Sequence, residues 1–355
     1  MNRENYAAAK KLIAASKRIL VSGHLSPDGD SLGSMLALAR LLRNAGYEAY
    51  ATADLNALGK PGFLDGVKDL IPVRKLKRQK KFDLFVAVDC ASFERMPPEV
   101  RPVAEKLPKL CIDHHVTNDG SFANVSIVDP SASSTGEIIW RIAKWNEWKL
   151  DTAIAEALWV AIVTDSGRFA YDSTKPGTMR AAGDLLKHGV RTALINDILY
   201  GTFPKKAIEL KRIAWRSLHI WKNRKVAEVT LTRDDFREVR GTKAEAEDVI
   251  EIPRQVARNE IALFFYQIPD RTKETRCSIR TRGDWDATVL AAKFGGGGHR
   301  KAAGCTIKKP LATAKRQMRT AVKDLLKQKG AKAAPKRDVA PQEAKNGEGA
   351  DTDGR

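Results

Sequence analysis

The sequence has few cysteines and no long apolar run. Four cysteines occur without CxxC spacing, at Cys90, Cys111, Cys277 and Cys305. This spacing argues against a structural zinc site and provides no disulfide framework. No apolar run approaches the roughly 20 residues that cross a bilayer, so we expect no membrane association. The first twenty residues indicate an amphipathic helix with lysines throughout, not a signal peptide. We therefore expect a cytoplasmic protein.

Acidic residues are in the minority. The chain has 62 Lys and Arg against 43 Asp and Glu, which gives a formal net charge of +19. A large positive balance favours polyanionic partners such as nucleic acid or nucleotides, although a general contribution to solubility is the alternative.

The first half alternates between short apolar runs and helical patterns. Apolar runs predict strands at 18–23, 47–52, 83–88 and 109–112. Helical periodicity follows at 31–46, 135–146, 152–164 and 178–188. We expect the helix at 31–46 to open at Ser31 and to close at Gly46. This alternation predicts an α/β domain with an open, mostly parallel sheet and flanking helices.

The second half has a different rhythm, which predicts a smaller α+β domain. Strands are expected at 225–232, 261–268 and 275–282, with helices near 285–294 and 311–328. The last residues are rich in Ala, Pro, Gly and charge, which is typical of disorder. We predict a first domain at 1–200, a connection at 201–222, a second domain at 223–329 and a disordered tail at 330–355.

Acids and histidines collect where the predicted elements of the first domain end. They are His24, Asp28 and Asp30 after the first strand, Asp89 after 83–88, Asp113, His114 and His115 after 109–112, and Asp165 after the apolar run 157–164. In open α/β sheets the carboxyl ends of the strands form the ligand site. Carboxylates packed together repel unless cations compensate. Each acid taken singly is also explained as a helix cap or turn former, and Asp30 is the clearest such case.

Taken together, these residues predict a site for divalent metal. Carboxylate oxygen with some imidazole nitrogen suits Mn²⁺, with Mg²⁺ and Co²⁺ as alternatives. Four Asp and two His are enough for two ions if one carboxylate bridges them, and two such ions support phosphoryl chemistry.

These motifs resemble those of the DHH phosphoesterases, a family that includes RecJ-type exonucleases, nanoRNase/pAp phosphatases and manganese pyrophosphatases. The resemblance covers roughly 15–310 and rests on four motifs in order: HLSPDGDS, the strand ending at Asp89, DHH, and Asp165-Ser-Gly. It implies one Mn²⁺ held by His24, Asp28 and Asp89, and a second held by Asp30, Asp89, His114 and Asp165. It further implies that Asp89 bridges the two ions, that His115 lies toward the substrate phosphate, and that Asp113 orients a ligand.

The second domain contains a run of four glycines followed by a histidine, FGGGGH, at 294–299. Glycines let backbone N–H groups approach an anion closely, although a flexible loop is the alternative. The run resembles the GGGH signature of the DHH-associated C-terminal domain, and CSIRTRG at 277–283 resembles the strand before it. The resemblance implies that the substrate is bound by Ser278, Arg280, Gly296, Gly297, Gly298 and His299.

The two-domain layout is most similar to that of the nanoRNase/pAp phosphatases. We therefore expect a Mn²⁺-dependent hydrolase of short single-stranded oligoribonucleotides and of 3′-phosphoadenosine 5′-phosphate (pAp), in which Asp89 and His115 are catalytic. Hydrolysis of cyclic dinucleotides or pApA, and a RecJ-like single-strand exonuclease, remain alternatives. The basic stretch 73–81 either guides longer RNA or is a solvated loop. Both a monomer and a homodimer fit the sequence.

Overall fold

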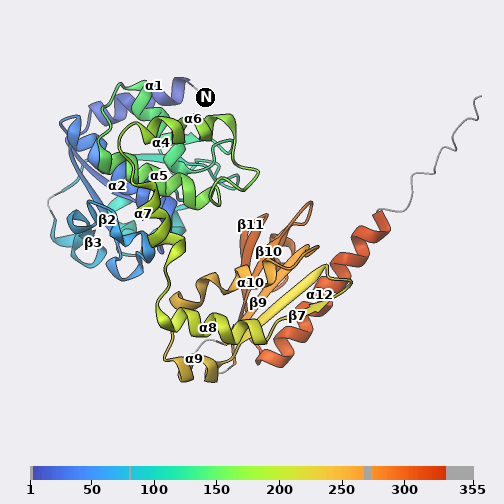
Figure 1. Ribbon diagram of the computed structural model, residues 1–355. Helices are drawn as coiled ribbons and strands as arrows, with labels where there is room; N and C mark the ends of the chain where they lie inside the picture. Colours follow the sequence, from blue (N-terminus) through green and yellow to red (C-terminus); the bar gives the residue numbers. More distant parts are fainter. Residues whose placement is uncertain (1–2, 80, 268–272, 333–355) are drawn as a thin grey trace, which may run out of the picture. The chain divides into compact units, whose positions relative to one another are not determined.

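The computed structural model describes residues 3–79, 81–267 and 273–332. The chain divides into two compact units, Met1–Thr202 and Phe203–Arg355, and each is described by itself (Figure 1). No helix in the described ranges is both long and apolar enough to cross a membrane. The predicted domain boundaries remain predictions, and the predicted tail from 333 onward lies outside the described residues.

The first unit is built on a parallel six-stranded sheet in the order β3-β2-β1-β4-β5-β6. The strands are β1 (Arg18–Ser22), β2 (Glu48–Ala53), β3 (Ile71–Pro72), β4 (Leu84–Val88), β5 (Lys109–Asp113) and β6 (Val125–Val128). The α/β prediction is confirmed. The edge strands β3 and β6 were not predicted, because β3 has only two residues and β6 is mostly half-buried.

Helices and turns cover both faces of this sheet. The α-helices are α1 (Arg3–Ala14), α2 (Gly29–Asn44), α3 (Arg101–Ala104), α4 (Thr135–Trp145), α5 (Thr152–Asp165), α6 (Pro176–Leu186) and α7 (Thr192–Asn196). The 3₁₀ turns are η1 (Leu55–Ala57), η2 (Lys60–Phe63), η3 (Val67–Asp69), η4 (Val73–Arg78) and η5 (Phe93–Arg95), and η6 (Asp197–Gly201) is a π-helical turn. Successive residues of β4 point into two different cores, Val86 toward the α2 side and Phe85 toward the α3 side. A strand buried on both faces explains the continuous apolar run at 83–88.

The start of α2 differs from the expectation. The helix begins at Gly29, and its N-cap is Asp28, whose carboxylate accepts the amide of Ser31 at 3.0 Å. Asp is a favoured N-cap because its oxygen satisfies an otherwise unpaired helix amide. Ser31 therefore lies in the first turn, where its side chain is buried, while Gly46 follows the helix with a φ of +93°, as its predicted closing role requires.

The second unit has a mixed six-stranded sheet in the order β11-β12-β10-β9-β8-β7, in which only the β8–β9 pair is parallel. The strands are β7 (His219–Trp221), β8 (Val226–Leu231), β9 (Ile261–Gln267), β10 (Thr275–Thr281), β11 (Gly297–His299) and β12 (Ala302–Ile307). The helices and turns are α8 (Lys205–Arg216), α9 (Arg233–Val239), η7 (Ala244–Ile250), α10 (Glu251–Arg254), α11 (Ala287–Ala292) and α12 (Leu311–Lys332). One core lies under α11 and α12 and another under α8, η7 and α10. The predicted α+β character is confirmed, and α8, inside the predicted connection, packs on β8.

Helices α2 and α5 approach each other closely at Gly33, where a Cβ atom would meet the carbonyl oxygen of Ala157. This contact matters for function because α2 carries Asp30 and α5 ends at Asp165. A buried glycine at such a contact lets two helix backbones come together, and any added methyl has to push them apart.

We therefore expect Gly33→Ala to lower the free energy of unfolding by about 1–3 kcal/mol, the usual cost of overpacking. The matched control is Gly183→Ala in α6, where an added Cβ meets nothing within 4 Å. That change removes only the helix penalty of glycine and should add about 0.5–1 kcal/mol. Urea titration of the two variants measures both values, and a Gly33→Ala protein as stable as the wild type would contradict the close-contact account.

Candidate metal centre

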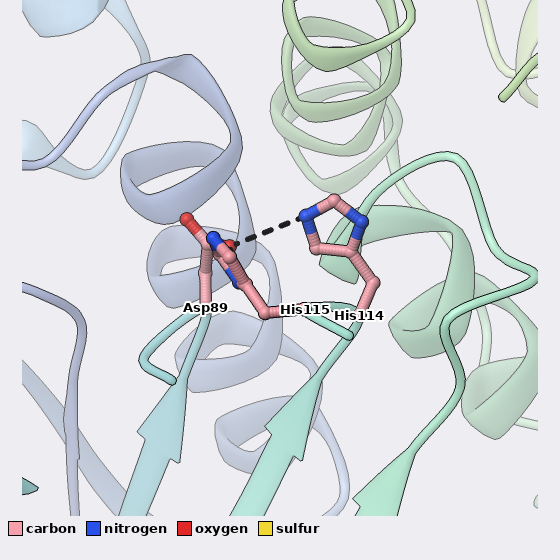
Figure 2. Close-up of side chains that lie close together, drawn as sticks. All are labelled: Asp89, His114 and His115. Atoms are coloured by element: carbon pink, nitrogen blue, oxygen red, sulfur yellow. Dashed lines mark ion pairs between the residues drawn. The ribbon is translucent and has the colours of Figure 1, made fainter. Parts of the chain in front are cut away.

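Three neighbouring strands bring their carboxyl ends to one edge of the first sheet. His24 lies two residues beyond β1, Asp89 follows β4 directly, and Asp113 is the last residue of β5, followed by His114 and His115. Figure 2 shows Asp89 and the two histidines extending from the ends of β4 and β5 toward one another. The parallel topology thus gathers residues that are far apart in sequence.

A first group of possible ligands forms around His24. Its Nε2 lies 3.5 Å from Oδ2 of Asp89 and 3.9 Å from Oδ2 of Asp28. One ligand atom from each of the three residues lies within 4.8 Å of the others, close enough to hold one ion. The N-cap role of Asp28 uses Oδ1, so the oxygen facing His24 is the other one. The capping and metal interpretations of Asp28 are therefore compatible.

A second group forms around His114. Its Nε2 lies 3.3 Å from Oδ2 of Asp165, 3.7 Å from Oδ2 of Asp30 and 3.7 Å from Oδ1 of Asp89. The ligand atoms of Asp30, His114 and Asp165 also lie within 4.8 Å of one another. Asp89 thus presents Oδ2 to the first group and Oδ1 to the second, as a bridging carboxylate requires.

The backbone of Asp89 is unusual. Its φ is +51°, in the left-handed region, which costs energy for most residues but which Asp and Asn tolerate better than others. The residue is buried, and its amide donates to the carbonyl of Ile112 at 3.0 Å. Such local strain clusters at functional sites. In this turn the two oxygens of Asp89 face different groups of candidate ligands, Oδ2 toward His24 and Oδ1 toward His114.

Asp30 is held by a contact that the sequence did not reveal. Its carboxylate accepts the amides of Thr135 at 2.7 Å and Gly136 at 2.9 Å, at the start of α4, and the hydroxyl of Ser34 at 3.1 Å. Helix N-termini favour negative charge. Asp30 is therefore a structural anchor as well as a candidate ligand. Ser134 caps α4 by accepting the amide of Glu137.

The three residues of the triplet Asp113-His114-His115 have different contacts, and His114 alone belongs to the second group of candidate ligands. Asp113 is fully buried, and its Oδ1 lies 2.7 Å from Nδ1 of His115. Its Oδ2 accepts a hydrogen bond from the side-chain Nδ2 of Asn118 at 2.6 Å. Burial acts to raise the pKa of Asp113, but His115 and Asn118 outweigh it and lower the pKa below the usual range. Asp113 therefore orients His115, and Asn118, a buried residue that the sequence reading missed, orients Asp113.

The carboxylates of the centre are crowded enough to hold protons. Burial raises the pKa of Asp30 well above its usual value, and the charges of Asp89 and Asp165 raise it further. Burial raises the pKa of Asp165 to about 7, against the opposing charge of His114. Burial acts to lower the pKa of His24, but Asp28 and Asp89 outweigh it and raise the pKa to about 9. Negative charge in this excess fits divalent cations as the missing partners.

The predicted substrate residues of the second unit lie on the end of its sheet formed by β10, β12 and β11. Arg280 pairs with Ala302 and Ser278 with Gly304, while on the other side of β12 His299 pairs with Ala302 and Gly297 with Gly304. These positions form two rows across the sheet. Along β10 the buried side chains alternate with half-buried ones, and Ser278 and Arg280 belong to the half-buried set.

Gly296 precedes β11, and Gly297 and Gly298 belong to it; the three glycines differ in what an added side chain would contact. A Cβ on Gly296 would meet the carbonyl oxygen of Gly304, and one on Gly298 would meet the backbone of Ala302 and Ala303. At Gly297 a Cβ would meet nothing within 4 Å. Packing therefore requires glycine at 296 and 298, whereas a Cβ at Gly297, which belongs to the row that contains Ser278, would enter open space.

Comparison with known proteins identifies the family. A model of the DHH family, N-terminal domain, matches residues 18–162, and a model of the DHHA1 domain matches residues 233–328. The chain is 31% identical, over 84% of its length and 87% of the relative's, to the bifunctional oligoribonuclease and PAP phosphatase NrnA of Thermus thermophilus. The chain belongs to the DHH family. It is therefore a member of a family of metal-dependent phosphoesterases that use divalent metals.

Two further similarities bear on function and fold. The chain is 25% identical to the cyclic-di-AMP phosphodiesterase GdpP of Geobacillus thermodenitrificans, over 89% of its own length but 49% of that protein's. A crystal structure of an exopolyphosphatase-related protein from Bacteroides fragilis superposes with a TM-score of 0.84 at 23% identity, covering 92% of this chain and 98% of the other. This superposition supports the fold alone.

We expect Mn²⁺ binding at pH 7 to release protons, because metal ligands must be deprotonated. His24, with a pKa of about 9, is protonated at this pH in the metal-free protein, and Asp165, with a pKa of about 7, is partly so. The raised pKa of Asp30 acts in the same direction. The affinity should rise as the pH increases through 7 toward 9. Titration calorimetry in buffers of different ionisation enthalpy counts the protons. Asp165→Asn should release fewer of them, and a binding heat independent of the buffer would contradict the ligand set.

Proposed function

We propose that this protein is a Mn²⁺-dependent phosphoesterase that degrades short oligoribonucleotides and converts pAp to AMP. The observation that carries the proposal is the pair of His/Asp groups sharing Asp89, with Oδ2 toward His24 and Oδ1 toward His114. The substrate class is supported by the similarity to the oligoribonuclease and PAP phosphatase of Thermus thermophilus. The cytoplasmic location, and a monomer or homodimer, remain predictions.

In this proposal His24, Asp28 and Asp89 hold one ion, and Asp30, Asp89, His114 and Asp165 hold the other. Bound there, two divalent ions would activate a water molecule and neutralise charge on the phosphoryl oxygens. Asp30 keeps its ligand oxygen in place through the amides of Thr135 and Gly136.

His115 takes the phosphate-facing role in the proposed mechanism. Its Nδ1 is paired with Asp113, so the orientation of the ring is set before substrate arrives. Burial acts to lower the pKa of His115, but Asp113 outweighs it and raises the pKa above the usual value. The raised pKa favours the protonated imidazole, which would donate a hydrogen bond to the charge that develops on the phosphoryl group.

The test is hydrolysis of a 5′-labelled RNA series from two to about twenty nucleotides, with pAp and pApA in parallel. We expect fast loss of the shortest RNAs and of pAp. Preference for long strands would favour a RecJ-like exonuclease. Activity on pApA alone would favour a cyclic-dinucleotide or pApA phosphodiesterase, the alternative that the similarity to GdpP supports.

The control is Asp89→Asn, because Asn tolerates the left-handed backbone but lacks the negative charge that both ligand groups share. This change should lower turnover at least about a thousandfold. A fully active Asp89→Asn protein would overturn the bridging assignment.

We further expect Arg280→Ala to raise KM for pAp and short RNA by about tenfold or more while kcat changes little. The reason is that a charge-assisted hydrogen bond contributes about 1.5–3 kcal/mol and is made equally in the ground and transition states. Arg276→Ala is the matched control, since Arg276 lies on the same side of β10 but pairs with Thr306, outside the rows that reach β11. Steady-state kinetics of both variants measure the difference, and an equal rise in KM for both would remove the special role of Arg280.

A further inference from the structure

Arg95 is an exposed cation beside the candidate metal centre, and it belongs to neither group of candidate metal ligands. It ends η5, six residues after Asp89. Within the described ranges its guanidinium makes no hydrogen bond and no ion pair. This lack of a partner is unexpected, because five carboxylates, from strand ends and helix ends, gather in the adjacent centre.

The backbone of Arg95 is fixed against the centre. Its carbonyl accepts the amide of Leu25 at 2.8 Å, and Leu25 follows His24 directly. On either side of it, Arg101 donates to the carbonyl of Glu94 and, at 3.1 Å, to that of Met96, which is fully buried. The turn is therefore held by Arg101 and Met96, and the Arg95 side chain is not needed to hold it.

The charge of Arg95 is felt inside the centre. Burial lowers and Asp113 raises the pKa of His115, and the charge of Arg95 lowers it. Burial raises the pKa of the Cys90 thiol to about 12, with Arg95 acting in the opposite direction. The backbone contact with Leu25 places Arg95 beside the residue that follows His24, and its charge acts on groups that follow β4 and β5.

The chemistry of an unpaired arginine at this place indicates an anion. Once divalent ions neutralise the carboxylates, those acids no longer attract the guanidinium. The remaining negative charge is that of the substrate, and the planar fork of arginine matches two phosphate oxygens. We propose that Arg95 binds a phosphate of the substrate on the His24 and His115 side of the metal centre. This inference rests on the proposed phosphoesterase function and adds a substrate-binding residue to it.

The phosphate that Arg95 binds is either the one being cleaved or the neighbouring one. A comparison of two substrates distinguishes these possibilities. Bis(p-nitrophenyl) phosphate has a single phosphate, whereas pAp has two. We expect Arg95→Ala to raise KM for pAp about tenfold or more, with a smaller change in kcat, and Arg95→Lys to recover part of the loss. An equal rise with both substrates assigns Arg95 to the cleaved phosphate, and a rise with pAp alone assigns it to the neighbouring one.

A structural role predicts other results. If Arg95 only supported the fold, Arg95→Ala would weaken Mn²⁺ binding in calorimetry, whereas the proposal predicts an unchanged or slightly higher Mn²⁺ affinity, because a nearby positive charge is removed. With a five-nucleotide RNA, the slope of log kcat/KM against log salt concentration should become shallower by about 0.7, the value for one lost single-strand phosphate contact. The control is Lys106→Ala, which removes an equally exposed charge before the amino end of β5, away from the centre, and should leave KM for pAp and for the single-phosphate ester unchanged.

The proposal is overturned if KM for both substrates stays within about twofold of wild type in Arg95→Ala, or if Mn²⁺ affinity falls in parallel with activity. Failure of the proposed function gives a different result. A wild-type protein that cleaves bis(p-nitrophenyl) phosphate but neither pAp nor RNA would contradict the proposed function, while the role of Arg95 would still be measured on that ester. If no ester is cleaved, calorimetric titration of pAp into the Mn²⁺-loaded wild type and Arg95→Ala proteins gives the same comparison.

Discussion

Repulsion between carboxylates is the constraint on which the rest of this structure depends. A parallel sheet places its carboxyl strand ends at one edge, and this chain puts Asp89 and Asp113 there, with Asp28, Asp30 and Asp165 delivered by helices. Two like charges about 4 Å apart repel by about 4 kcal/mol at the effective dielectric near a protein surface. The fold offsets part of this repulsion internally. The amides at the start of α4 compensate Asp30, and Asn118 and His115 compensate Asp113. Asp89 is compensated by imidazoles and, at 3.4 Å, by the hydroxyl of Thr135, and Asp165 by the imidazole of His114. The negative charge that these contacts leave uncompensated is the reason we expect the centre to bind cations.

The same constraint explains why apparently structural details gather around the centre. The left-handed backbone of Asp89 costs energy locally, but it lets one carboxylate face His24 and His114 through different oxygens. The close contact of α2 with α5 at Gly33 brings together the helices that carry Asp30 and Asp165. Neither feature is required by an α/β sheet as such. Both features are explained if the carboxylates must be held in fixed positions, so that one oxygen of Asp89 faces each group of candidate ligands.

Much of this architecture was predictable, and the exceptions have a common cause. The buried strands β1, β4 and β5 were visible as apolar runs because both of their faces are covered, and the candidate ligands followed from where those runs end. The contact of Asp30 with Thr135 and Gly136 was not predictable, since it joins positions about a hundred residues apart through backbone amides of any sequence. The N-cap of α2 was placed at Ser31 although Asp28 fills it, because both residue types cap helices equally well. Arg95 gave no signal at all, since an arginine in a turn looks like ordinary surface charge until its carbonyl is found bonded to the residue after His24.

The excess positive charge of the chain and the negative charge of the centre together imply an order of events. The formal net charge of +19 attracts polyanions to the protein from a distance, yet the metal-free centre repels a phosphate at short range. A phosphate therefore approaches productively only after cations have occupied the carboxylates. The proton that His24 holds in the metal-free state, at a pKa of about 9, reduces the repulsion only in part, since Asp89 lies 3.5 Å from the His24 imidazole. Two divalent ions would cancel most of the charge of the five carboxylates, so metal binding is expected to remove the short-range repulsion that the empty centre exerts on a phosphate.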